Sequence, residues 1–281
     1  MKKISLLFLF GLVFTLGVQT RAVYTPSATE TQQLAAIKNT LNTVSNSDLL
    51  GYYQQFASLA QQVAGHDEKL DYFLQNLRDY SYSQFSSQKN IAKQSARAGN
   101  ADFVNELKDK LLIDGEISNS CLGYYNMIDN LSFANDFPTA LSMAMRWRES
   151  TCGFVLPKNG DGPFQIVTKD YGTGEMTTQI FSQTLQDFFD FSKNKIQRYN
   201  NANSADGLAI SLAYTGASLV DLLRFSALYN GLSGSTVYGD IQPAQPKYFR
   251  EGYSNSIWTG EVKKDGILST YIKALQWELK Q

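Results

Sequence analysis

Glu149 is the residue whose type and position best fit a catalytic role in this chain. It ends an apolar segment in which Leu141 and Met145 recur at helical spacing. On a helical wheel at about 100° per residue, Glu149 falls at the edge of the stripe that these two side chains form. A carboxyl group there is partly desolvated, which raises its pKa and lets it keep a proton near neutrality, as a general acid must. The same position also fits a boundary glutamate that meets solvent or pairs with Arg146, because structural ion pairs perturb carboxylates too.

The rest of the composition excludes several other kinds of site. The chain has 281 residues, with a single histidine, His66, and two cysteines, Cys121 and Cys152. Zinc sites built from clustered His or Cys ligands are therefore not expected, and we predict neither a metal nor a cofactor. A formal charge of −1 provides no polybasic surface, so nucleic acid is not an expected partner. With 43% hydrophobic residues the chain can bury a sizeable core.

The N-terminus predicts export. Residues 1–22 open with Lys2 and Lys3, continue with an apolar run from Ile4 to Val18 and end just after Arg21. This three-part pattern is typical of a secretory signal. A retained membrane anchor is the alternative, because the run is at the short end of what spans a bilayer and Arg21 is an unusual neighbour for a cleavage site. We expect export to the periplasm or to the extracellular cell wall.

The two cysteines suit an exported protein. An oxidising compartment favours pairing when the number of cysteines is even. We expect one disulfide between Cys121 and Cys152, which would close a loop of about thirty residues and contribute roughly 3 kcal/mol. A catalytic cysteine acting with His66 is the alternative. It is disfavoured because pairing would consume both thiols and because His66 lies far upstream.

Apolar spacing predicts a mainly α-helical chain. Between Ser27 and Phe85, apolar residues recur by threes and fours, which predicts an antiparallel helical hairpin or small bundle. The stretch from Tyr80 to Asn100 is polar and rich in Ser and Gln, so a linker and a domain boundary are expected there. Later helices are expected over residues 103–112, 122–131, 138–149, 181–199, 219–229 and 266–280, with loops at 157–163 and 235–261. The predicted organisation is a signal at 1–22, a helical N-terminal region and linker at 23–100, and a second domain at 101–281.

Three short motifs follow one another in the second domain. They are Arg148-Glu149-Ser150, then Gly162-Pro163-Phe164-Gln165-Ile166, then Ala227-Leu228-Tyr229-Asn230-Gly231. In this order and spacing the chain resembles the lysozyme-like superfamily of soluble lytic transglycosylases and goose-type lysozymes, glycoside hydrolase family 23. The resemblance covers roughly residues 120–235. It implies a lysozyme-like α (α+β) catalytic domain with a C-terminal extension.

The resemblance assigns roles to individual residues. It implies that Glu149 is the catalytic acid and base and that Tyr229 lies beside its carboxyl group. The residues that it places around the substrate are Ser150, Gly162, Phe164, Gln165, Tyr229 and Asn230. Read from the residues alone, Tyr229 could equally be a core aromatic at a helix end, and Asn230 an ordinary helix stop.

The reaction that the resemblance implies needs one carboxylate. Glycosidases normally use two, and no second carboxylate occupies a convincing position, because Asp161 and Asp170 are merely near in sequence. Lytic transglycosylases cleave the bond between N-acetylmuramic acid and N-acetylglucosamine in peptidoglycan. The substrate's own N-acetyl group assists, and a 1,6-anhydro product forms without water. We therefore expect this reaction on peptidoglycan glycan strands, with lysozyme-type hydrolysis as the alternative.

Two further hypotheses concern the N-terminal helices. The chain could be a non-catalytic envelope protein, in which a lysozyme-like domain binds glycan or a partner and the helices recruit it. It could also be a wall-cutting enzyme attached to a secretion or conjugation machine. In both cases the N-terminal helices are the expected binding place for an envelope protein partner.

Overall fold

The computed structural model describes residues 24–111, 113, 115–153, 160–166, 168–172, 176–203, 209–229 and 267–281. In this part the chain is mainly α-helical, as the sequence predicted, and one short two-stranded hairpin accompanies the helices. The expected signal at 1–22, residues 157–159 of the loop at 157–163 and the whole loop at 235–261 lie outside the described residues, as does Asn230. None of the described helices combines the length and the apolarity needed to cross a membrane.

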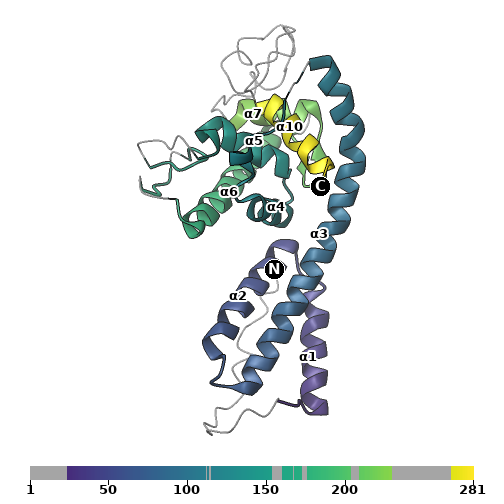
Figure 1. Cartoon of the computed structure of the whole chain (residues 1–281), viewed down its shortest axis with the longest axis vertical. Coiled ribbons are helices and arrows are strands. Elements are labelled where there is room, and N and C mark those ends of the chain that lie inside the picture. Colours follow the sequence, from purple (N-terminus) through teal and green to yellow (C-terminus); the bar gives the residue numbers. More distant parts are fainter. Residues whose placement is uncertain are drawn as a thin grey trace.

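The N-terminal region is a small helical bundle. Helices α1 (Ala28–Leu41) and α2 (Asn46–Val63) pack against the first half of α3 (Glu68–Leu111), as Figure 1 shows. Ser27 and Ser45 each begin a helix by accepting the N–H of the third residue along, which satisfies a donor that the first turn leaves free. Apolar side chains at helical spacing, among them Leu49 and Leu77, form the core of this bundle. The predicted hairpin or small bundle is therefore confirmed.

Helix α3 corrects the predicted linker. The chain does not leave the helix between Tyr80 and Asn100, but continues as one helix of 44 residues that runs along both parts of the molecule (Figure 1). At 1.5 Å per residue such a helix is about 66 Å long. The second half of α3 lacks a broad apolar stripe. Polar side chains hold this half against the rest of the molecule instead. Lys89 and Lys93 each place Nζ 3.2 Å from the buried carboxylate of Asp129.

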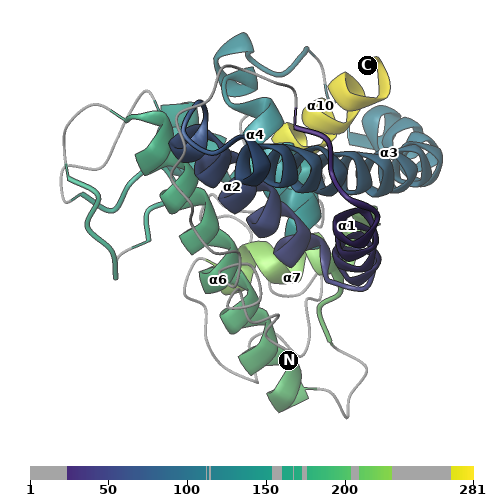
Figure 2. The same cartoon turned by 90° about the horizontal axis from the view of Figure 1, so that it is seen from below.

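The second part of the molecule surrounds one central helix, α5 (Thr139–Ser150). Pro138 occupies its N-cap, close to the predicted start, and almost every residue of the helix is buried. Figure 1 shows α5 among its neighbouring helices, of which it contacts α4 and α10 directly, and Figure 2 shows α6 and α7 from below. The helices of this part other than α5 are α4 (Tyr125–Ala134), α6 (Thr178–Asn203), α7 (Leu219–Tyr229) and α10 (Ile267–Leu279).

Three short elements complete the described fold. The 3-10 turn η2 (Asn119–Leu122) precedes α4, and η3 (Thr151–Gly153) follows α5. Strands β1 (Leu212–Ala213) and β2 (Gly216–Ala217) pair antiparallel, with Leu212 opposite Ala217. The hairpin lies against α3, so it joins the long helix to the part of the molecule that holds α5.

Candidate active site

Glu149 lies in the last turn of α5, with its side chain turned into the protein. Only 6% of the residue is exposed, and Oε1 has no hydrogen-bond partner among the described residues. The helix ends directly after it because Thr151 and Cys152 adopt left-handed backbone angles, with φ of 51° and 62°. Two consecutive non-glycine residues in this region store backbone strain, which is a common property of functional sites.

Burial controls the protonation of Glu149. Desolvation raises the pKa of its carboxyl group to about 7, and the positive charge of Arg148 partly opposes this rise. The alternative of an ion pair with Arg146 is wrong, because that guanidinium is used elsewhere. Arg146 donates to the carbonyl oxygen of Gly123 at 2.8 Å and to that of Cys152 at 2.6 Å. Glu149 therefore has the partly protonated state that the sequence position predicted.

The end of α5 is fixed by a covalent bond and by the Arg146 guanidinium. A disulfide joins Cys121 to Cys152, as predicted, with 5.0 Å between the two Cα atoms. The Arg146 bonds to the carbonyls of Gly123 and Cys152 span the same two segments. Its guanidinium also lies 4.8 Å from the ring centroid of Phe181, within the range of cation–π attraction. Together these contacts tie the residues after Glu149 to the 3-10 turn η2.

The turn from Gly160 to Ile166 approaches α5 from the other side. Gly162 has φ of 73°, and a Cβ atom there would come within 2.7 Å of the Tyr171 ring, so only glycine fits. Gln165 also has a positive φ, of 50°, and its side-chain amide donates to the main-chain carbonyl of Glu149. This bond joins the second sequence motif directly to the first.

Tyr229 joins the third motif to the second. It is the last residue of α7, and its hydroxyl donates to the carbonyl oxygen of Phe164 at 2.5 Å. Lys195 of α6 donates to the carbonyls of Leu228 and Tyr229 at 3.1 and 3.0 Å, which satisfies two acceptors at the helix end. The three motifs are thus brought together through hydrogen bonds, although about 80 residues separate the first from the third.

Two other residues of the predicted site are buried. Phe164 is 0% exposed and stacks on Phe188 with 4.5 Å between ring centroids, so its side chain is a core residue. The expectation that the Phe164 side chain contacts substrate is corrected on this ground. Ser150 donates to the carbonyl of Arg146 at 3.0 Å and accepts the N–H of Gly153 at 2.9 Å. These two bonds support the end of the helix.

The sequence does not predict several residues that hold the candidate site in place. Arg146 was considered only as a partner of Glu149, and Lys195 was not singled out. Tyr171 packs on Gly162 and donates to Asp187 at 2.9 Å, and Lys169 lies 3.1 Å from the same carboxylate. No local pattern marks these residues, because their partners are distant in the chain. No cluster of metal-ligating side chains occurs within the described ranges.

Comparisons with known proteins identify no relative. No protein-family model, curated protein or solved structure matches this chain. The site is therefore inferred from its own geometry. Glu149 is buried, the turn that contains Gly162 bonds its main chain, and Tyr229 holds this turn.

Alanine in place of Gly162 should damage the site, and Gly172 offers a matched control. Both glycines have positive φ, of 73° and 75°, but of these two only Gly162 would bring an added Cβ atom against a described side chain. We expect Gly172→Ala to cost about 1 kcal/mol from backbone strain alone. Gly162→Ala should cost a further 1–3 kcal/mol, roughly, because Tyr171 must move. Urea unfolding measures both costs, and equal losses would contradict the close approach.

Proposed function

We propose that this chain is a peptidoglycan lytic transglycosylase in which Glu149 alone acts as general acid and base. The observation that carries the proposal is a buried carboxyl group with a free Oε1, among the described residues, at the point where the three motifs meet. A group with its pKa raised to about 7 can both donate and accept a proton near neutral pH, which is what a residue with two successive roles needs.

The proposed reaction uses one carboxyl group twice. Glu149 donates its proton to the glycosidic oxygen as the bond from C1 of N-acetylmuramic acid breaks. The N-acetyl group of the same sugar stabilises the positive charge that develops at C1. The resulting carboxylate then takes the proton of the C6 hydroxyl while O6 bonds to C1. Glu149 ends the cycle protonated, as it began, and no water molecule enters the product.

The electrostatic surroundings of Glu149 favour a mechanism with one carboxylate. Burial and Arg148 account for the shift of its pKa, and no second carboxylate contributes from the described parts of the chain. Asp187 bonds Tyr171 and Lys169, and Asp170 accepts the N–H of Gly172 at 2.8 Å. These carboxylates are thus occupied in holding the turn. Two free carboxylates facing one another would be required for the usual glycosidase reactions.

The proposed location is the periplasm or the extracellular cell wall. The disulfide between Cys121 and Cys152 fits an oxidising compartment, where peptidoglycan is found. The N-terminal bundle, which α3 connects rigidly to the rest of the molecule, is the proposed place for an envelope partner.

The mass of the digestion products tests the proposal. Purified peptidoglycan is incubated with the protein and the soluble fragments are analysed by mass spectrometry. We expect 1,6-anhydro ends, which are lighter by one water molecule than hydrolysed ends, and no release by Glu149→Gln. Hydrated ends would replace the transglycosylase with a lysozyme-type hydrolase. A folded wild type that releases nothing but sediments with peptidoglycan would indicate a glycan-binding protein instead.

A further inference from the structure

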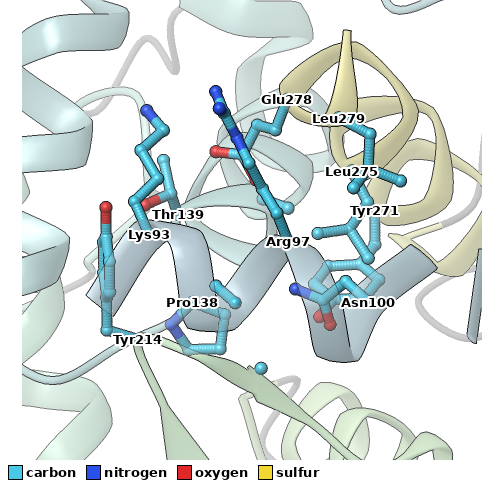
Figure 3. Close-up of a pocket in the computed structure, with 13 residues that line it drawn as sticks. Lys93, Arg97, Asn100, Pro138, Thr139, Tyr214, Tyr271, Leu275, Glu278 and Leu279 are labelled. Atoms are coloured by element: carbon cyan, nitrogen blue, oxygen red, sulfur yellow. The ribbon is translucent and has the colours of Figure 1, made fainter. Parts of the chain in front are cut away.

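A pocket lies at the opposite end of α5 from Glu149. Helices α3 and α10, the first residues of α5 and the β1–β2 hairpin surround it (Figure 3). Ten residues of helix separate Thr139 from Glu149, so the pocket is about 15 Å from the candidate active site along the helix axis. Its lining combines apolar side chains with polar ones, among them Arg97, Tyr271 and Glu278.

The N-terminus of α5 contributes two of these donors. Pro138, the N-cap residue, supplies no side-chain hydrogen bond to the helix. Thr139 and Ala140 are the first two residues of the helix, so no preceding helical carbonyl accepts their N–H groups, and both residues line the pocket. Free N–H groups together with the helix dipole make the start of a helix attractive to anions.

Tyr271 supplies an independent sign of a ligand. This residue of α10 is 0% exposed and lines the pocket. Its hydroxyl has no hydrogen-bond partner in the described part of the chain. A buried hydroxyl without a partner is unfavourable, and it is uncommon in native proteins unless a bound group satisfies it.

Helix α3 brings positive charge to the same pocket. Figure 3 shows Lys93 and Arg97 extending from α3 in the same direction, with Arg97 next to Glu278 of α10. Lys93 is held in place, since it donates to the Tyr125 hydroxyl at 2.8 Å and lies 3.2 Å from Asp129. Arg97 differs, because its buried Nε has no partner among the residues described. The Nε of Arg97 is therefore open to a ligand, while its guanidinium lies beside the Glu278 carboxyl.

We propose that this pocket binds a small oxyanion, either a carboxylate or a phosphate-sized group. The α5 N–H groups, the Tyr271 hydroxyl and the Arg97 guanidinium hold its oxygens. Arginine recognises carboxylate and phosphate oxygens through paired N–H groups, and charged hydrogen bonds of this kind are strong. The side chains of Leu275 and Leu279 and the ring of Pro138 complete the lining, so the ligand group is small. This inference does not depend on the proposed enzymatic function.

The charges around the pocket are compatible with an anion. The charged and titratable groups facing it or bonded to its lining are Lys89, Lys93 and Arg97 of α3, Tyr125 and Asp129 of α4, Asp136 between α4 and α5, Tyr214 of the hairpin, and Tyr271 and Glu278 of α10. Asp129 is neutralised by the two lysines. Burial raises the pKa of Glu278 to about 7, so near neutrality this carboxyl is partly protonated and can donate to an oxyanion. The net charge around the pocket is then positive, because Arg97 and the N-terminus of α5 are not neutralised.

Titration calorimetry with inorganic phosphate tests the site on the whole protein. Phosphate and acetate are titrated at constant ionic strength maintained by chloride, so that general salt effects cancel. We expect saturable binding of at least one of them. Arg97→Gln should weaken it about tenfold, because a charged hydrogen bond is lost. Tyr271→Phe should weaken it about fivefold, because it removes only the unpartnered hydroxyl. Arg198→Gln, on the exposed face of α6, should leave binding unchanged.

Two further ligands distinguish the source of the oxyanion. A dipeptide with a free carboxylate that binds, while its amide does not, would identify a carboxylate carried on a larger molecule. Binding of phosphate or acetate without the dipeptide would identify a free ion. Heat signals that do not saturate would overturn the proposal. So would binding that Arg97→Gln and Tyr271→Phe both leave unchanged, provided that circular dichroism shows both variants to be folded.

Discussion

Replacing Glu149 with Gln is expected to abolish glycan cleavage and leave the fold intact. The substitution keeps the size of the side chain but removes the proton that must move, so the rate should fall by about a thousandfold or more. The exposed Glu68, in the first turn of α3, gives a matched Glu→Gln control that should retain full activity. Release of soluble fragments from purified peptidoglycan measures the effect. A Glu149→Gln variant as active as the control would remove Glu149 from the mechanism.

The pH dependence of the wild type should report the same group. The acid step needs protonated Glu149, whose pKa burial raises to about 7. The value of kcat/KM should therefore decline as the pH rises through about 7. Arg148→Gln should move this decline to higher pH, because the nearby positive charge lowers the pKa of Glu149. A value of kcat/KM that stays constant between pH 6 and pH 9 would assign the proton transfer to another group. The range begins about two units above the usual pKa of glutamate.

The stability of the Glu149→Gln variant should exceed that of the wild type at alkaline pH. The pKa of Glu149 rises on folding from 4.5 to about 7, so between these values the folded state binds more protons than the unfolded state. The free energy of unfolding of the wild type therefore falls as pH rises through this window. Glutamine does not titrate, and the variant should gain roughly 3 kcal/mol relative to the wild type between pH 4 and pH 8. Urea unfolding at the two pH values, with Glu68→Gln as the control, measures this difference.

Removing the disulfide should destabilise the protein and weaken catalysis. Cys121 and Cys152 are separated by 31 positions, and closing a loop of that length contributes about 3–4 kcal/mol in the chain-entropy model. The bridge also anchors the segment directly after Glu149. Without it, the strained backbone at Thr151 and Cys152 depends on Arg146 and Ser150 alone, and the carboxyl group loses its fixed position.

A double Cys121→Ser, Cys152→Ser variant separates the bridge from other effects of reductant. We expect a lower melting temperature, a smaller kcat and no further change on adding dithiothreitol. The wild type in dithiothreitol should approach the variant. Unchanged melting temperature and activity in the reduced wild type, with free thiols demonstrated by titration, would show that the disulfide does not support the site.

Much of the local structure could be predicted from the sequence because local physics determines it. Apolar spacing by threes and fours located α5, α6, α7 and α10 to within a few residues. The position of Glu149 at the edge of the α5 stripe led to the prediction of a partly desolvated carboxyl group, and an even number of cysteines led to the disulfide. Each inference needs only neighbours along one helix or the redox state of a compartment.

The prediction was wrong about α3 for an equally physical reason. The stretch from Tyr80 to Asn100 has no apolar stripe, which locally favours a linker. In the folded chain its lysines find the buried carboxylate of Asp129, a residue some 40 positions away. The prediction for Phe164 was wrong for a similar reason. Its ring belongs to the core because it stacks on Phe188 of α6, a contact that the local sequence does not reveal.

The sequence by itself determined a helical chain, a bridge between its two cysteines and one glutamate at the boundary of an apolar face. The tertiary structure alone decided that Arg146 bonds backbone carbonyls and that Oε1 of Glu149 has no partner among the described residues. It also decided that Gln165 and Tyr229 connect the three motifs, and that Arg97 and Tyr271 share a pocket with the start of α5. The reason is that helical periodicity depends on residues a few positions apart. Hydrogen-bond partners and burial depend on which distant segments meet.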